Sequence, residues 1–265
     1  MHCHSADSSS LVRSMKKLAE QEGYTKIVAK VPENDWPLFK KHGYKAEAKI
    51  PRYYKNGHSC FFACHYLVAD RAVIKNEKMI CTALKTAQNK VEKESINLAK
   101  GIGLPDHLKL RQLTENDVTE LAGLYSKVFA SYPFPIQDEM YLIKTMREHV
   151  FYYGLYHTSK LIAAASSETD PDQQNSEMTD FAVLPQHRGQ RLAACLLAEM
   201  EKAMVQKGFQ TFYTIARATS IGMNTTFVRA GYAYGGTLIN NTQIAGQIES
   251  MNVWYKTITR PDLTS

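Results

Sequence analysis

The sequence has no long hydrophobic run: no stretch approaches the ~18 consecutive apolar residues that a membrane-spanning helix needs. Its opening residues, MHCHSADSSS, lack the apolar core of a secretory signal. Cysteines are few, five in 265 residues, and their odd number and irregular spacing exclude a disulfide framework. These absences predict a cytoplasmic protein that has no membrane partner.

The excess of positive charge is also small, with 32 Lys and Arg against 26 Asp and Glu, a net charge of +6. The basic residues are dispersed and form no stripe interleaved with aromatics, so we expect no nucleic-acid partner. An excess of this size suits an acidic ligand such as a nucleotide as well as it suits solubility alone. Hydrophobic residues make up 44% of the chain, which is typical of a folded globular protein and excludes wholesale disorder.

One group of side chains is of the metal-binding type: His58, Cys60, Cys64 and His65. The run that contains the last three is apolar and aromatic and is typical of a strand, whose alternation would place these side chains on two faces. No second ligand pair with zinc-like spacing is present. We therefore predict buried thiols and no metal site.

The chain contains a weak internal repeat. Leu11–Val31 resembles Leu196–Ala216, since each has an amphipathic helix, a glycine–aromatic pair and a β-rich run. Each continues into a second helix that stops at a glycine, Gly43 or Gly231, which favours the left-handed turn that ends a helix. Two further extended runs follow in both copies. The alternative is a chance resemblance between two αβαβ pieces.

This repeat predicts three segments. Residues 1–70 are a truncated half-module, residues 71–106 a helical linker, and residues 107–260 a complete domain beside which the half-module packs. The linker prediction depends on Asp70–Lys100, which is charged and free of Gly and Pro, and on the breakers Gly101–Pro105 that follow. We expect one long helix there.

The residue pattern of the complete domain predicts mixed α/β structure in the order βααβββαβαββ. Leu108–Leu113 alternates apolar and polar residues, as a half-buried strand does, and Thr114 with Asp117 is typical of a capped helix start. Further along, the loop Pro185–Arg191 joins a strand to a helix. A helix N-terminus presents unbonded N–H groups and the positive end of the helix dipole, which suits a pyrophosphate. The alternative is an ordinary strand–loop–helix joint.

The residues of this loop, Arg188-Gly-Gln-Arg-Leu-Ala193 after Val183-Leu-Pro185, resemble the acetyl-CoA loop of the GNAT N-acetyltransferases, Arg/Gln-x-x-Gly-x-Gly/Ala. The chain departs from the pattern at Arg191, which replaces the middle glycine; we expect it to keep helical φ and ψ and to cover a CoA phosphate. The resemblance implies the GNAT fold, a twisted mixed sheet of six or seven strands flanked by four helices, and acetyl-CoA as co-substrate with no metal. The residues it places at the cofactor are Phe181, Val183, Arg188, Gly189, Gln190, Arg191, Leu192, Ala193 and Asn224.

Longer motifs resemble the β-lysine N-acetyltransferases within that family. They are Tyr132–Ile136, Glu177–Val183, Gly222–Phe227, Gly236–Thr242 and Ile248–Lys256. This resemblance implies acetyl transfer to the terminal amine of β-lysine or a close diamino acid, a small-molecule substrate. A polyamine, protein-lysine or antibiotic acetyltransferase, a non-catalytic acyl-CoA-binding module, and a homodimer all stay open.

The chemistry requires a base, because an alkyl ammonium must lose a proton before it attacks a thioester. Glu177 and Asp180 are the candidates; otherwise they are solvated acids at a strand end. They are three residues apart, so pleating predicts that they point to opposite faces and that only one enters the cleft. Backbone N–H groups near Phe181 to Val183 are the candidates for stabilising the thioester oxygen.

No general acid is assigned. Phe227 occupies the position where many GNAT relatives carry a tyrosine, and Tyr232 or Tyr234 could act in its place.

β-Lysine carries two amines and a carboxylate, so its pocket needs acids, amides and a cation. Arg147 or Arg217 are candidates for the carboxylate. Asn240-Asn241 fits a hairpin turn equally well, because Asn tolerates positive φ, and Tyr132 fits a pocket wall. The predicted substrate-binding residues are Tyr132, Glu139, Asn240, Asn241, Glu249 and Asn252.

Overall fold

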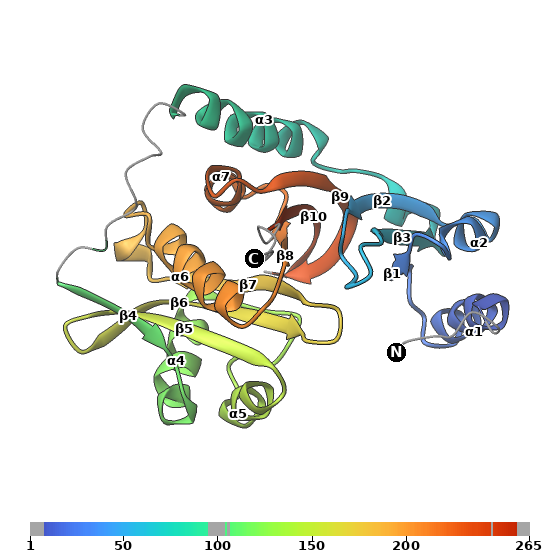
Figure 1. The fold of residues 1–265 in the computed structure, drawn as a ribbon. Coiled ribbons are helices and arrows are strands. Elements are labelled where there is room, and N and C mark those ends of the chain that lie inside the picture. The colour runs from blue at the N-terminus through green and yellow to red at the C-terminus, as the bar shows by residue number, and fades with distance from the viewer. Residues whose placement is uncertain (1–7, 95–103, 105–106, 245, 259–265) are drawn as a thin grey trace, which may run out of the picture.

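The protein is described by a computed structural model that covers residues 8–94, 104, 107–244 and 246–258. One sheet runs through the whole molecule, with ten strands in the order β1-β3-β2-β9-β10-β8-β7-β6-β5-β4 (Figure 1). The strands are β1 (Lys26–Pro32), β2 (Lys45–Ile50), β3 (Cys60–Tyr66), β4 (Leu108–Gln112), β5 (Val150–His157), β6 (Lys160–Asp170), β7 (Asn175–Val183), β8 (Thr211–Arg217), β9 (Ala233–Ile244) and β10 (Gln247–Thr257). The helices are α1 (Ser8–Gln21), α2 (Trp36–Lys41), α3 (Glu77–Glu94), α4 (Val118–Val128), α5 (Glu139–Arg147), α6 (Leu192–Gln206) and α7 (Ile221–Arg229).

Helices cover both faces of the β4–β7 part of the sheet. Helices α4 and α5 lie on one face and α6 on the other (Figure 1). Their apolar stripes, with Leu121, Leu142 and Leu196 fully buried, close a large core against β5, β6 and β7. The predicted capping box before α4 is confirmed, since the Thr114 N–H donates to the Asp117 carboxylate at 2.8 Å. Residues 107–258 contain seven strands and four α-helices, apart from Ala245, which is not described, so the predicted architecture is confirmed.

The N-terminal elements repeat the order of the C-terminal ones. The series α1-β1-α2-β2-β3 has the same sequence of helices and strands as α6-β8-α7-β9-β10. Both series also share a strand order, since β1-β3-β2 corresponds to β8-β10-β9. The two meet where β2 pairs with β9 at Ala48 and Gly236. A Cβ on Gly236 would lie 2.1 Å from the Glu47 carbonyl oxygen, so only glycine allows this approach.

The connecting segment differs from the prediction. A helix was expected from Asp70, but a short 3-10 turn over Ala69–Ala72 comes first and α3 begins only at Glu77. The reason is that Asn240 Nδ2 donates to the carbonyls of Arg71 and Val73, at 2.9 and 2.8 Å, and holds this stretch out of a helix. Helix α3 then packs along α7 (Figure 1). The predicted end of the linker, residues 95–103 and 105–106, lies outside the described residues.

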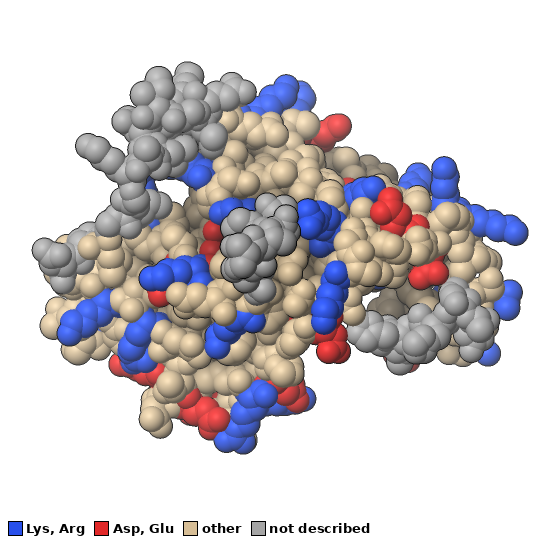
Figure 2. Space-filling model, viewed as in Figure 1, with Lys and Arg blue, Asp and Glu red and all other residues tan. Residues whose placement is uncertain are grey.

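The surface carries both signs of charge. Figure 2 shows lysine and arginine side chains interspersed with acidic ones over the visible face. No helix in the described part of the chain is long and apolar enough to span a membrane. The thiols of Cys60 and Cys64 are buried, whereas the His65 ring packs against Tyr44 and its Nδ1–H donates to the Gly43 carbonyl. Among the described residues, no three His, Cys, Asp or Glu side chains lie close enough to share a metal ion.

Candidate active site

The only parallel pair of strands in the described sheet opens into a cleft. Strands β7 and β8 pair from Asn175–Thr211 to Glu177–Tyr213 and then separate. The space between them, here called the inner cleft, is lined by Thr179–Phe181 on β7 and Thr214–Arg217 on β8. Beyond Glu177 the β7 backbone has no pairing with β8, so its polar groups on that side are available to a ligand.

At one end the inner cleft leads into a cavity of about 570 Å³, here called the loop cavity, beside the N-terminus of α6. The predicted anion site is therefore a real hollow. In the described chain, the backbone N–H groups of residues 189–193 donate to no other backbone group, as expected for a helix N-terminus. Seven of the nine predicted cofactor residues line this cavity: Phe181, Val183, Arg188, Gly189, Arg191, Leu192 and Ala193.

Arg191 does not have the predicted backbone. It has φ 60° and ψ 19°, the left-handed region, and forms the N-cap of α6. The expectation of helical φ and ψ was wrong because the chain must reverse between Gly189, at φ 80°, and Leu192, where the helix starts. A glycine takes this conformation at no steric cost, whereas an L side chain is strained there by roughly 1–2 kcal/mol. The side chain is exposed and lines the loop cavity.

Two predicted cofactor residues lie elsewhere. Gln190 is exposed and does not line the loop cavity. Asn224 is fully buried, and its amide is saturated: Nδ2 donates to the carbonyls of Arg217 and Ser220, while Oδ1 accepts from Asn252 Nδ2 and Trp254 Nε1. The amide of Asn224 thus ties α7 to β8 and β10 and is not directed at the cavity.

At its other end the inner cleft meets a second hollow of about 730 Å³, here called the amine cleft, between β7, α5 and β9. Both Glu177 and Asp180 line it, so the prediction that they face opposite sides was wrong. The reason is a β-bulge: the register with β6 passes from Ala164–Ala182 to Ser166–Thr179, which leaves one extra residue on β7. Asp180 takes φ 53° in this bulge, and the strand alternation shifts by one.

Asp180 lies where the amine cleft and the inner cleft meet, since it lines both. Its carboxylate accepts hydrogen bonds of 2.6 Å from the Tyr132 hydroxyl and 2.6 Å from the Ser166 hydroxyl. Burial raises the pKa of Asp180, and these hydrogen bonds partly oppose the rise. Such a carboxylate is fixed in position and is a stronger proton acceptor than a solvated one.

Glu177 has a partner that the sequence did not reveal. Lys30 on β1 places its Nζ 3.8 Å from Glu177 Oε2 and donates to the Tyr213 hydroxyl at 2.7 Å. Burial raises the pKa of Glu177, although the Lys30 ammonium lowers it in part. The sequence held no local signal for this pair, because the two residues are 147 positions apart on strands that are not neighbours.

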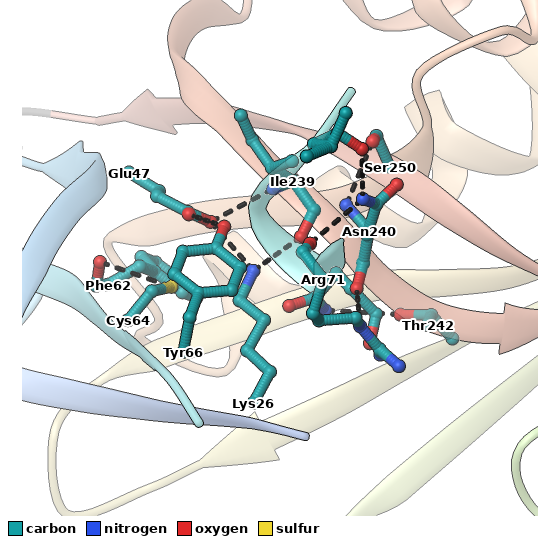
Figure 3. A network of polar contacts seen from close by, with 12 residues as sticks. Lys26, Glu47, Phe62, Cys64, Tyr66, Arg71, Ile239, Asn240, Thr242 and Ser250 are labelled. Atoms are coloured by element: carbon teal, nitrogen blue, oxygen red, sulfur yellow. Dashed lines mark hydrogen bonds and ion pairs between the residues drawn. The ribbon is translucent and has the colours of Figure 1, made fainter. Parts of the chain in front are cut away.

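A buried polar network positions the part of β9 that faces the amine cleft (Figure 3). Lys26 and Glu47 form an ion pair of 2.8 Å, with side chains only 2% and 9% exposed. Glu47 also accepts from the Ile239 N–H, and Lys26 donates to the Ile239 carbonyl. Arg71 adds a bond from its Nε to the Asn240 carbonyl at 2.7 Å. The half-module therefore fixes a segment in which the β9–β10 register is irregular.

Asn241, at the end of this segment, lines the amine cleft. Its Oδ1 is buried and has no hydrogen-bond partner in the described chain. A buried carbonyl oxygen without a donor carries a cost in free energy. Neither Asn240 nor Asn241 forms a hairpin turn, since both lie within β9.

Of the predicted substrate residues, Tyr132 and Asn241 line the amine cleft, and the others do not. Glu139 is exposed in the first turn of α5. Asn240 bonds the connecting segment, and Asn252 bonds Asn224 and Thr237. Glu249 is buried and pairs with Arg217 at 3.0 Å.

The carboxylate-binding candidates also lie outside the amine cleft. Arg147 is exposed and forms a two-pronged pair with Glu115, and Arg217 lines the inner cleft and the loop cavity. The substitutes for a general acid are no closer: Tyr232 is buried against Phe227 and Tyr234 bonds Thr237, and neither lines any of the three hollows.

Comparisons with known proteins identify a family and several relatives that this chain resembles. Residues 119–232 match the model of the Acetyltransferase (GNAT) family. The chain is 38% identical over 256 residues to the β-lysine N(6)-acetyltransferase of Methanococcus maripaludis, across 94% of this chain and 89% of that protein. It is 31% identical over 258 residues to the β-lysine N(6)-acetyltransferase of Methanosarcina mazei, across 92% and 95%. Among solved structures, the ribosomal-protein-S18-alanine N-acetyltransferase from Escherichia coli matches with a TM-score of 0.52 at 15% identity, covering 60% of this chain and 98% of that one, which shows a shared fold.

Proposed function

Because the chain belongs to the GNAT acetyltransferase family, we propose that it transfers the acetyl group of acetyl-CoA to the terminal amine of β-lysine (3,6-diaminohexanoate) or a close diamino acid. One observation carries the proposal: Asp180, a partly buried carboxylate, lines both the amine cleft and the inner cleft. A proton acceptor thus lies where an amine from one side meets an acyl donor from the other. The names of the two β-lysine N(6)-acetyltransferases support the choice of substrate.

The loop cavity fits the phosphates of CoA. It offers the N–H groups that open α6, with the side chains of Arg188 and Arg191 beside them, and a helix N-terminus with added cations is a strong anion site. The inner cleft then leads from this cavity to Asp180 between the separated strands. Acetyl-CoA supplies the activated thioester. The N–H groups of β7 from Phe181 to Val183 are the proposed donors to the thioester oxygen as it gains negative charge.

Asp180 is the proposed base, and Glu177 adds negative charge at the far side of the cleft. Asp180 takes one proton from the terminal ammonium, and the neutral amine that results is the nucleophile. Tyr132 and Ser166 hold the carboxylate in place through their hydroxyls. The amine nitrogen attacks the thioester carbon, and the C–S bond breaks as the amide C–N bond is completed; the second amine proton passes to the departing thiolate, so CoA leaves as the thiol. No side-chain acid is proposed for this step, since Phe227 lines the inner cleft where a tyrosine would have served.

The second ammonium of the substrate has acceptors in the amine cleft. Glu168 and Glu177 are the candidate acceptors, since both carboxylates line this cleft. The four carboxylates of the lining, Glu148, Glu168, Glu177 and Asp180, favour a polyamine as the second candidate substrate. Asn240, Glu249 and Asn252 are proposed to position the site through their hydrogen bonds to Ser250, Arg217 and Asn224.

A thiol-release assay with lysine, β-lysine, ornithine and spermidine tests the proposal. We expect β-lysine to have the highest kcat/KM. Equal values on all four amines would overturn the substrate assignment, and binding of acetyl-CoA without thiol release on any amine would overturn the enzymatic function.

We also propose the domain division expected from the repeat: residues 1–70 as a truncated GNAT-like half-module, 71–106 as the linker and 107–260 as the transferase domain. The matching element order and strand order support it. A cytoplasmic location and a homodimer stay predictions, which cell fractionation and light scattering would check.

A further inference from the structure

A lysine from outside the transferase domain lies in the wall of the amine cleft. We propose that Lys30, on β1 of the half-module, binds the carboxylate of the amino-acid substrate and so determines the choice between a diamino acid and a plain diamine. This inference deepens the proposed function and rests on it.

The ammonium of Lys30 is held in one place. It donates to the Tyr213 hydroxyl at 2.7 Å and lies 4.8 Å from the centre of the Tyr213 ring and 6.0 Å from that of Tyr53. Glu177 stands 3.8 Å away, beyond a direct hydrogen bond. The side chain is 41% exposed and lines the amine cleft, so a ligand can reach the donors that remain.

Strand β1 reaches this position because the sheet curls. Four strands separate β1 from β8 in the sheet order, yet Lys30 contacts Tyr213 of β8. The loop after β2 stabilises this contact between β1 and β8. Thr211 Oγ1 donates to the Arg52 carbonyl at 2.7 Å, and Asn175 Nδ2 donates to the Tyr53 carbonyl at 3.2 Å. The half-module is thus bonded to the ends of both strands that form the inner cleft.

The charges of the amine cleft explain why a cation is needed there. Its carboxylates attract ammonium groups of any diamine and repel a substrate carboxylate. Among the described lining residues, the cations are Lys30 and Lys144. Lys144 is 68% exposed and lies 4.0 Å from Glu148, so solvent weakens its attraction for a ligand. Lys30 is the more enclosed and the better fixed of the two.

The spacing along β7 also fits. Glu177, next to Lys30, and Asp180 are three residues apart, which is roughly 10 Å in an extended strand and less across a bulge. An extended six-carbon diamino acid has a similar length. Its terminal ammonium can therefore lie at Asp180 while its carboxylate lies at Lys30.

The test compares β-lysine with 1,4-diaminopentane, the same molecule without its carboxylate. We expect the wild-type enzyme to prefer β-lysine by at least tenfold in kcat/KM. Lys30→Met should raise the KM for β-lysine tenfold to a hundredfold, the range for loss of a charge-assisted hydrogen bond, and change kcat/KM for the diamine less than twofold. Lys49→Met, a surface lysine of the same half-module paired with Glu33, is the matched control and should change neither.

A purely structural role would give a different pattern. If Lys30 only balances Glu177, Lys30→Met would weaken both substrates equally, and the inference would be wrong. The double variant Lys30→Met/Glu177→Gln leaves no buried charge unpaired and should still lose the preference for β-lysine. A selective loss in Lys144→Met instead would also overturn the assignment. If the wild type acetylates both substrates equally, the enzyme class stands and the inference fails; if it acetylates neither, the proposed function itself fails.

Discussion

Replacing Arg191 by alanine and by glycine separates the effect of its side chain from that of its backbone. Both variants lose a guanidinium at the loop cavity, where we expect it to bind a CoA phosphate. Loss of one charge-assisted hydrogen bond costs about 1.5–3 kcal/mol, so both should raise the KM for acetyl-CoA roughly tenfold to a hundredfold. The KM for the amine should stay unchanged, because the amine cleft lies at the other end of the inner cleft.

The two variants should differ in stability. Arg191 has φ 60°, and alanine keeps the strain of this conformation while glycine relieves roughly 1–2 kcal/mol of it. Glycine also makes the unfolded chain more flexible, which reduces this gain in the free energy of unfolding by about 0.4–1 kcal/mol. We expect Arg191→Gly to unfold at a higher temperature than Arg191→Ala by a few degrees, measured by calorimetry with acetyl-CoA kinetics in parallel. If the glycine variant binds acetyl-CoA more tightly than the wild type, the arginine obstructs the site and this reasoning is refuted.

Three further predictions concern the base and the junction. Asp180→Asn should lower kcat by roughly 10²–10⁴-fold. Burial raises the pKa of Asp180 and the base must be ionised, so wild-type activity should fall as the pH drops through that pKa. The pH–rate profile of the variant should lack this acidic limb. Glu47→Ala leaves Lys26 buried without its partner and should cost about 3–5 kcal/mol in urea unfolding, whereas an unchanged midpoint would show that the pair is dispensable. Gly236→Ala places a Cβ 2.1 Å from the Glu47 carbonyl oxygen, so thermal unfolding should show a loss of at least ~2 kcal/mol, and a stable variant would contradict the close β2–β9 approach.

The architecture could be predicted from the sequence because its signals are local. The alternation of Leu108–Leu113, the capping box at Thr114 and the helix-ending glycines each depend on a few neighbouring residues. The loop before α6 could be predicted for the same reason, and most of its expected cofactor residues line one cavity.

Two predictions about the site were wrong because the backbone departs from regular geometry there. A strand of ordinary pleat would separate Glu177 from Asp180, but one inserted residue puts both in the amine cleft. Arg191 likewise takes a left-handed conformation that its residue type disfavours. Neither feature has a signal in the residues themselves, because no glycine marks either position.

The contacts that the sequence could not show are those between distant segments. Lys30 reaches the amine cleft only because the sheet curls, and Asn240 turns away from it only because the connecting segment offers two carbonyls. Residue type and local spacing do not predict such long-range contacts. For the same reason the sequence predicts ligand contacts for Asn224 and Asn252, whereas in the structure their amides bond each other.

The most direct test of the proposed function is to identify which nitrogen of β-lysine receives the acetyl group. The purified full-length protein is incubated with acetyl-CoA and β-lysine, and the product is analysed by NMR and tandem mass spectrometry. We predict a single product acetylated on the terminal N6 amine, since we place that amine at Asp180 and the carboxylate end at the far side of the cleft. Acetylation at N3, or no acetylated β-lysine at all, would contradict it.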